Sequence, residues 1–122
     1  MFLLSSSSVH SDWIIAFALT IIIEMPVFTL LGRKYASAVK AAAAGVLCSC
    51  ITHPLLWFAW RPLFDSYIIW AISGEAAVIA IEAIVFYTVV RPTPFTKALA
   101  ISLLANATSY GTGLLLNTFG IV

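Results

Sequence analysis

Four long apolar runs, separated by short polar breaks, divide the chain. They cover residues 13–32, 37–60, 67–90 and 96–118. Each run has the roughly 20 mostly apolar residues that a helix needs to cross a bilayer. Strands are excluded because the runs lack period-two alternation and an open strand would leave unpaired backbone groups in lipid. The pattern predicts an all-α integral membrane protein, a four-transmembrane-helix bundle that forms a single membrane domain over residues 1–122.

The composition excludes the soluble classes of protein. Of the 122 residues, 62% are hydrophobic and only 9% are charged, and the mean hydropathy is +1.07. A soluble domain is about half apolar and about a quarter charged. The net charge is +1, with no polybasic run, so nothing indicates a nucleic-acid partner. The partner that the composition does predict is the lipid bilayer.

The basic residues predict the orientation of the bundle. Five of the six lie in or beside the connections that follow the first and third runs: Arg33, Lys34, Lys40, Arg91 and Lys97. Because cytoplasmic loops carry the excess of Lys and Arg, both connections are expected in the cytoplasm and both termini outside it, in a cell (inner) membrane. All four tryptophans then fall at the outer interface, where indole rings are favoured.

An offset of 58 residues aligns the first run with the third. The superimposed pairs are Ile23 with Ile81, Glu24 with Glu82, Val27 with Val85, Phe28 with Phe86, and Arg33 with Arg91. Apolar matches are common by chance in membrane sequences, whereas a Glu and an Arg at the same spacing are not. The match predicts two parallel two-helix repeats, over residues 13–60 and 67–118, related by an axis along the membrane normal, as occurs in transporters.

Four ionisable side chains are expected at membrane depth: Glu24, Glu75, Glu82 and His53. A charge at the bilayer centre costs about 2.5–3.5 kcal/mol on insertion scales, so each is a candidate site residue. Their positions along the helices predict two layers, with Glu24 and Glu82 facing the bundle interior on the cytoplasmic side. His53 and Glu75 lie further toward the outer side, where they could form a His–carboxylate pair.

The lower pair of acids predicts proton or cation chemistry. Two close carboxylates cannot both stay ionised without a cation, so either one holds a proton or the two together hold a cation. The alternative is that each Glu is a hydrogen-bonded packing residue. On the third run, Val78 and Ile79 lie between Glu75 and Glu82 on the same helix face, which favours a dry stretch between the two layers.

Two prolines lie inside the expected spans, close to ionisable residues. Pro26 follows Glu24 by two positions, and Pro54 follows His53 directly. Because proline removes a helical hydrogen bond, both positions are predicted kinks. Kinked or broken helices line cavities in transporters, although a kink can also serve packing alone.

Small and polar residues share one face of the second run and one face of the fourth. The second run carries Ser37, Ala41, Gly45 and Ser49, with His53 next; the fourth carries Ser102, Asn106, Ser109 and Gly113, with Ala105 beside them. Such faces let helices approach closely, so they are predicted packing seams. Asn106 could also donate a hydrogen bond to a carboxyl group near mid-membrane.

Three kinds of function fit these features. The favoured one is a cation- or proton-coupled transporter or ion-conducting protein, in which Glu24 and Glu82 bind the ion and His53, Glu75 and Asn106 line the path. Four helices barely enclose a path, so this hypothesis could require a homodimer. The first alternative is a non-catalytic assembly or accessory subunit that pairs with another membrane subunit.

The second alternative is a membrane-embedded metal-dependent enzyme. The sequence has no metal-ligand spacing, no nucleophile motif and no soluble catalytic loop, so no catalytic residue is predicted and a non-enzyme is favoured. Metal ligands stay unassigned. Beyond a cation that the acids could bind, no cofactor is expected.

Overall fold

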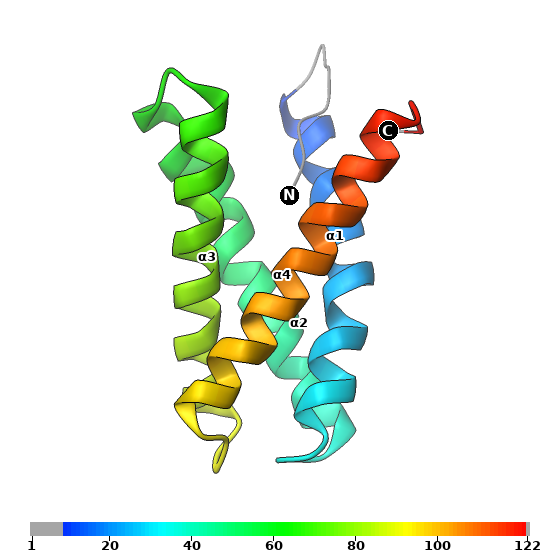
Figure 1. The fold of residues 1–122 in the computed structure, drawn as a ribbon, viewed down its shortest axis with the longest axis vertical. Helices are drawn as coiled ribbons and strands as arrows, with labels where there is room; N and C mark the ends of the chain where they lie inside the picture. Colours follow the sequence, from blue (N-terminus) through cyan, green and yellow to red (C-terminus); the bar gives the residue numbers. More distant parts are fainter. Residues whose placement is uncertain (1–8, 122) are drawn as a thin grey trace.

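The computed structural model describes residues 9–121 as four helices joined by short connections. The helices are α1 (Val9–Gly32), α2 (Ala38–Pro54), α3 (Tyr67–Val89) and α4 (Phe95–Thr118), shown in Figure 1. Helix α2 continues as a π-helical segment, η1 (Leu55–Trp60), and a 3-10 turn, η2 (Arg61–Leu63). The described range contains no strand.

The four expected spans are confirmed as helices long and apolar enough to cross a membrane. The apolar part of the first runs over Trp13–Gly32, as expected, although α1 itself begins at Val9. The second continues to Leu63 rather than ending at residue 60. The chain is therefore an all-α, multi-pass membrane protein with a four-helix bundle.

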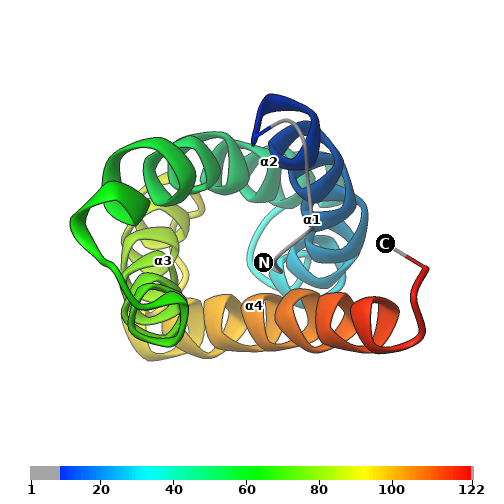
Figure 2. The same cartoon turned by 90° about the horizontal axis from the view of Figure 1, so that it is seen from above.

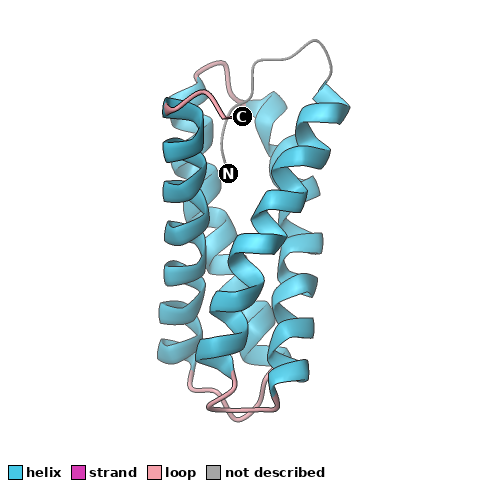
Figure 3. Cartoon of the chain, turned by 90° about the vertical axis from the view of Figure 1, so that its right-hand side faces the viewer, coloured by secondary structure: helices cyan, strands magenta, loops and turns pink. Residues whose placement is uncertain are grey.

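Seen along its axis, the bundle is a ring of four helices (Figure 2). Helix α1 packs against α2 and α4, and α3 packs against the same two, so α1 and α3 lie diagonally opposite each other. Helix α4 crosses obliquely, from beside α3 near its start to beside α1 near its end (Figure 1). The connections after α1 and α3 lie together at one end (Figure 3), which we name the connecting end. The opposite end, where α1 starts and α4 ends, is the terminal end.

Serine and proline residues define the starts of the helices. Ser37 precedes α2, and its hydroxyl accepts a hydrogen bond from the backbone N–H of Lys40 at 3.1 Å. Ser66 does the same for α3, accepting from Ile69 at 3.4 Å. Such caps satisfy backbone donors that the first turn leaves unpaired. Pro94 precedes α4 and has no backbone N–H, so one of the donors that a helix start leaves unpaired is absent there.

Neither proline breaks its span. Helix α1 is one continuous α-helix through Pro26. At Pro54 the second span changes from α-helix to the π-helical turns of η1, an irregularity that proteins often place at functional sites. The carbonyl oxygen of Leu56 in η1 accepts a hydrogen bond from the indole N–H of Trp70 on α3 at 3.1 Å. The irregular turn is thereby tied to the neighbouring helix.

The tryptophans gather at the terminal end, as expected, but not as a belt on the surface. Trp57 and Trp70 are only 3% and 1% exposed and form the centre of an apolar cluster, with Trp13 and Trp60 packed against it. The guanidinium of Arg61 lies 5.4 and 5.1 Å from the rings of Trp57 and Trp70, within cation–π range. Trp57 and Trp70 are therefore packed inside the bundle at this end rather than on its surface.

The small-residue faces are confirmed as packing seams, except at Ser37, which is exposed and caps α2. Ala41, Gly45 and Ser49 on α2 are buried, as are the corresponding small residues of α4. At Gly45 an added Cβ would lie 2.8 Å from the Cβ of Phe28, so α1 and α2 are in backbone-to-side-chain contact here. Phe28 in turn stacks on Phe86 of α3, with ring centroids 5.4 Å apart. This stack lies in the second apolar cluster, toward the connecting end.

Candidate functional site

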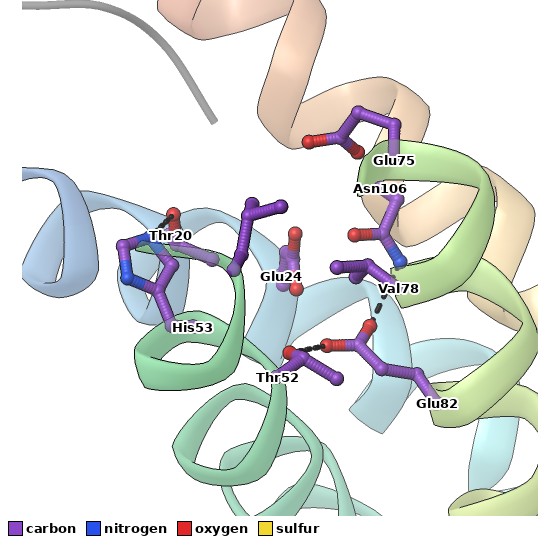
Figure 4. A pocket seen from close by; sticks show the side chains of 9 residues that line it. Thr20, Glu24, Thr52, His53, Glu75, Val78, Glu82 and Asn106 are labelled. Carbon is purple, nitrogen blue, oxygen red and sulfur yellow. Dashed lines mark hydrogen bonds between the residues drawn. The ribbon is translucent and has the colours of Figure 1, made fainter. Parts of the chain in front are cut away.

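A layer of polar side chains separates the two apolar clusters in the middle of the bundle. We name it the central polar layer; all its members are buried and come from all four helices: Thr20, Glu24, Ser49, Thr52, His53, Glu82 and Asn106. Most of them line a cavity of about 10 Å³ (Figure 4). A cavity of this size holds about one water molecule.

Glu82 is the most completely bonded member of the layer. It is 1% exposed, as expected for an interior position. Its Oε2 accepts a hydrogen bond from the hydroxyl of Thr52 at 2.6 Å, and its Oε1 accepts one from the amide of Asn106 at 2.8 Å. The prediction that Asn106 donates to a carboxyl group is confirmed. Donors from α2 and α4 thus hold this α3 carboxyl group from both sides.

Glu24 is equally buried but more loosely held. It is 2% exposed, and its one described hydrogen bond is a long one, 3.4 Å from the hydroxyl of Ser49. The Ser109 hydroxyl lies near the same carboxyl group. Figure 4 shows Glu24 in the centre of the cavity, between His53 and Thr20 on one side and Glu82 on the other. Both acids therefore face the interior and one shared space.

His53 contacts α1 rather than Glu75. Its Nε2 lies 3.4 Å from the hydroxyl of Thr20, and its buried Nδ1 has no hydrogen-bond partner among the described residues. Its ring packs against Phe17 and Trp57, with centroids 5.2 and 6.3 Å away. The expected His–carboxylate pair is thus replaced by a histidine–threonine contact at the edge of the aromatic cluster.

Glu75 lies on the terminal side of the layer. It lines the cavity together with His53, and Figure 4 shows it beyond Asn106 as seen from Glu82. Buried Val78 lies between the two acids of α3, but both acids line the same cavity. Glu75 is only half-buried, because it also borders a second space on the outside of the bundle.

Two members of the layer, Thr20 and Thr52, were not singled out by the sequence. Thr20 precedes Glu24 by four positions, so the shared helix face was available as a signal. Thr52 had no such signal, because it bonds an acid on another helix, Glu82 of α3. Serines and threonines in membrane helices commonly bond their own backbone, and sequence does not separate the two cases.

The side chains around the central cavity determine which atoms a bound ion would contact. Within residues 9–121, no group of three or more His, Cys, Asp and Glu side chains is arranged to hold a metal ion. A cation in the central cavity would be held by the two carboxyl groups together with hydroxyl and amide oxygens. Such oxygen ligands suit protons and hard cations rather than soft metals.

Comparison with known proteins finds no family model, no curated relative and no solved structure that matches the chain.

Proposed function

We propose that this protein is a small cation- or proton-coupled transporter or ion-conducting protein, in which Glu24 and Glu82 carry the exchanged ion in mid-membrane. The observation that carries the proposal is the burial of both acids in one cavity, from helices on opposite corners of the ring. A purely structural bundle would place apolar residues there, since buried carboxyl groups are unfavourable in a membrane interior.

The geometry at Thr52 supports proton exchange. Its hydroxyl lies 2.6 Å from Oε2 of Glu82 and 2.9 Å from the backbone carbonyl of Cys48. A hydroxyl has one proton, so it donates to one of these oxygens at a time. When Glu82 is ionised, Thr52 donates to it. When Glu82 is protonated, Glu82 donates to Thr52, whose own proton turns to Cys48. Glu82 can thus gain or lose a proton without leaving any partner unsatisfied.

The difference between the two acids supports a division of roles. Glu82 has two close hydrogen bonds, from Thr52 and Asn106, whereas Glu24 has a long one from Ser49, with the Ser109 hydroxyl nearby. An ion or water entering the cavity displaces little at Glu24. In this proposal Glu24 is the acid that first exchanges its ion, and Glu82 is the second, better-held site.

The packing across the ring supports the proposed repeat. Glu24 and Glu82, 58 positions apart, line the same cavity, and Phe28 and Phe86, at the same offset, stack face to face. The hydroxyl and amide neighbours of the two acids correspond at an offset of 57, Ser49 with Asn106 and Thr52 with Ser109. The proposal is that residues 13–60 and 67–118 form two parallel repeats around a pseudo-twofold axis that passes between the acids.

The small volume of the central cavity indicates how an ion would cross the bundle. Room for about one water molecule is not an open channel, so the proposed transport requires the two halves to move relative to each other. The apolar clusters on either side of the layer would then act as the two gates. A homodimer is the arrangement we propose to brace such a movement.

The test is ion flux in liposomes that contain the purified protein. Proton entry is followed with a trapped pH dye at a clamped potential, and Na⁺ and K⁺ entry with the matching dyes. We expect Glu24→Gln and Glu82→Gln each to reduce flux to the level of empty liposomes. Asp65→Asn, which changes an exposed acid in the α2–α3 connection, should leave flux unchanged.

Each variant is first checked for native helicity and for a single peak in size-exclusion chromatography. Glutamine keeps the size and hydrogen-bonding capacity of the side chain, so the fold should persist. Undiminished flux in both folded variants, or no protein-dependent flux of any of the three ions, would overturn the proposed function.

A further inference from the structure

A groove of about 350 Å³ lies between α3 and α4 on the outside of the bundle. This volume falls within the range of small-molecule sites, about 300–1,000 Å³. The alanines Ala71, Ala76 and Ala107 leave the space open, and Ile72 and Leu103, both exposed on the bundle surface, form part of its apolar wall. The groove therefore faces the hydrocarbon of the membrane.

Three polar side chains interrupt the apolar wall. They belong to Glu75, Asn106 and Tyr110. Glu75 supplies an acid to a surface that is otherwise almost free of charge. An aromatic face and a carboxyl group in an apolar site together favour an organic cation, through charge pairing and cation–π attraction.

The groove is continuous with the central polar layer. Glu75 and Asn106 line both the groove and the central cavity. The Asn106 amide that borders the groove is also the donor to Oε1 of Glu82. A ligand that contacts Asn106 therefore acts directly on a hydrogen-bond partner of Glu82.

We propose that this groove binds a hydrophobic organic cation, one positive charge shielded by apolar groups, which enters sideways from the lipid and is the transported substrate. The inference rests on the proposed function and names its substrate class. A neutral lipid chain would fill the apolar wall but make no use of Glu75. A hydrated inorganic ion would make no use of the apolar wall.

The test is equilibrium binding of tetraphenylphosphonium to the purified, detergent-solubilised protein. Tetraphenylborate, which has nearly the same size and shape but the opposite charge, is the ligand control. We expect the phosphonium to bind and the borate not to bind. Glu75→Gln should weaken phosphonium binding by about tenfold or more, since it removes the opposite charge. Tyr110→Leu should weaken it severalfold, and Tyr110→Phe should not.

A second variant tests the place of binding without touching a charge. Ala107→Phe fills the groove from α4 and should abolish binding. Ala107 is exposed on the bundle surface, so the larger side chain has room in the folded protein. The matched control is Ala80→Phe on α3, which is also exposed and does not border the groove; it should bind like the unchanged protein.

The outcomes separate this inference from the proposed function. Equal binding of phosphonium and borate, no binding of either, or binding that is indifferent to Glu75→Gln and Ala107→Phe overturns the inference, even if flux still depends on Glu24 and Glu82. Binding that needs Glu75, in a protein whose flux is unaffected by Glu24→Gln and Glu82→Gln, upholds the groove as a cation site but overturns the transport role.

Discussion

At the scale of single residues, the hydroxyl of Thr52 decides how Glu82 can be buried. It is the nearest partner of that carboxyl group, at 2.6 Å, and it has a second acceptor in the Cys48 carbonyl. A buried carboxyl oxygen without a partner is strongly disfavoured. The threonine therefore stabilises the acid in the membrane interior and gives it two satisfied states.

Replacing Thr52 by valine tests this role. Thr52→Val keeps the shape but removes the hydroxyl, and should lower the free energy of unfolding by about 1–3 kcal/mol, because Oε2 of Glu82 loses its partner. Ion flux should fall together with the free energy of unfolding. Thr52→Ser keeps a hydroxyl, so its stability and its flux should stay close to those of the unchanged protein. Unfolding in detergent and liposome flux are the measurements.

Thr108 offers a matched control for the same change. Its hydroxyl bonds only its own helix, at the carbonyl of Leu104, and it faces outward. Thr108→Val should therefore have little effect on stability or flux. If Thr52→Val behaved like Thr108→Val, the hydroxyl of Thr52 would have no special part in holding Glu82.

At the scale of helices, the fit of α1 against α2 depends on a missing side chain. An added Cβ at Gly45 would meet Cβ and Cδ2 of Phe28 at 2.8 and 2.9 Å. Phe28 cannot retreat freely, since its other side stacks on Phe86. Gly45→Ala should therefore destabilise the bundle by about 1–3 kcal/mol through overpacking.

Gly111 on α4 is the internal comparison, because an added Cβ there meets nothing within 4 Å. Gly111→Ala should be neutral or should stabilise the helix by about 0.5–1 kcal/mol, as expected for a glycine inside a helix. Unfolding of both variants by denaturing detergent measures the difference. Equal stability of the two alanine variants would show that the α1–α2 seam is not tightly packed.

Helix positions were predictable from the sequence, but one helical irregularity was not. Length and hydropathy are local properties, so the four spans were expected within a few residues of their observed limits. The sequence indicated a kink at Pro54 but not the π-helical turns that follow it from Leu55 to Trp60. The carbonyl of Leu56 in these turns accepts a hydrogen bond from the indole N–H of Trp70 on α3, a partner that lies outside the local sequence.

At the scale of the whole molecule, the ends of the bundle differ in charge. The connecting end carries Arg33 and Lys34 after α1 and Arg91 after α3, whereas the terminal end has Asp65 beside Arg61 in the α2–α3 connection. The positive-inside rule then predicts that the connecting end faces the cytoplasm.

Labelling of single cysteines in intact cells tests this orientation. A membrane-impermeant maleimide should modify Asp65→Cys in intact cells and Lys34→Cys only after permeabilisation. The protein without an added cysteine is the control and should not be labelled. Its Cys48 is buried in the bundle, and its Cys50 lies in the middle of the second span. The reverse labelling pattern would show that the bundle is inserted the other way round.

The sequence by itself determined the class of protein, the four helices and the inward direction of Glu24 and Glu82. Hydropathy and helical periodicity are properties of one segment at a time, and the high free energy of a buried charge allows few placements for an acid. Only the tertiary structure decided which side chains meet. Thr52 and Asn106 bond Glu82, and Thr20 contacts His53. Glu75 borders the groove between α3 and α4. These contacts depend on how each helix is rotated and how α4 crosses its neighbours. Rotation and crossing are set by packing between segments far apart in the chain.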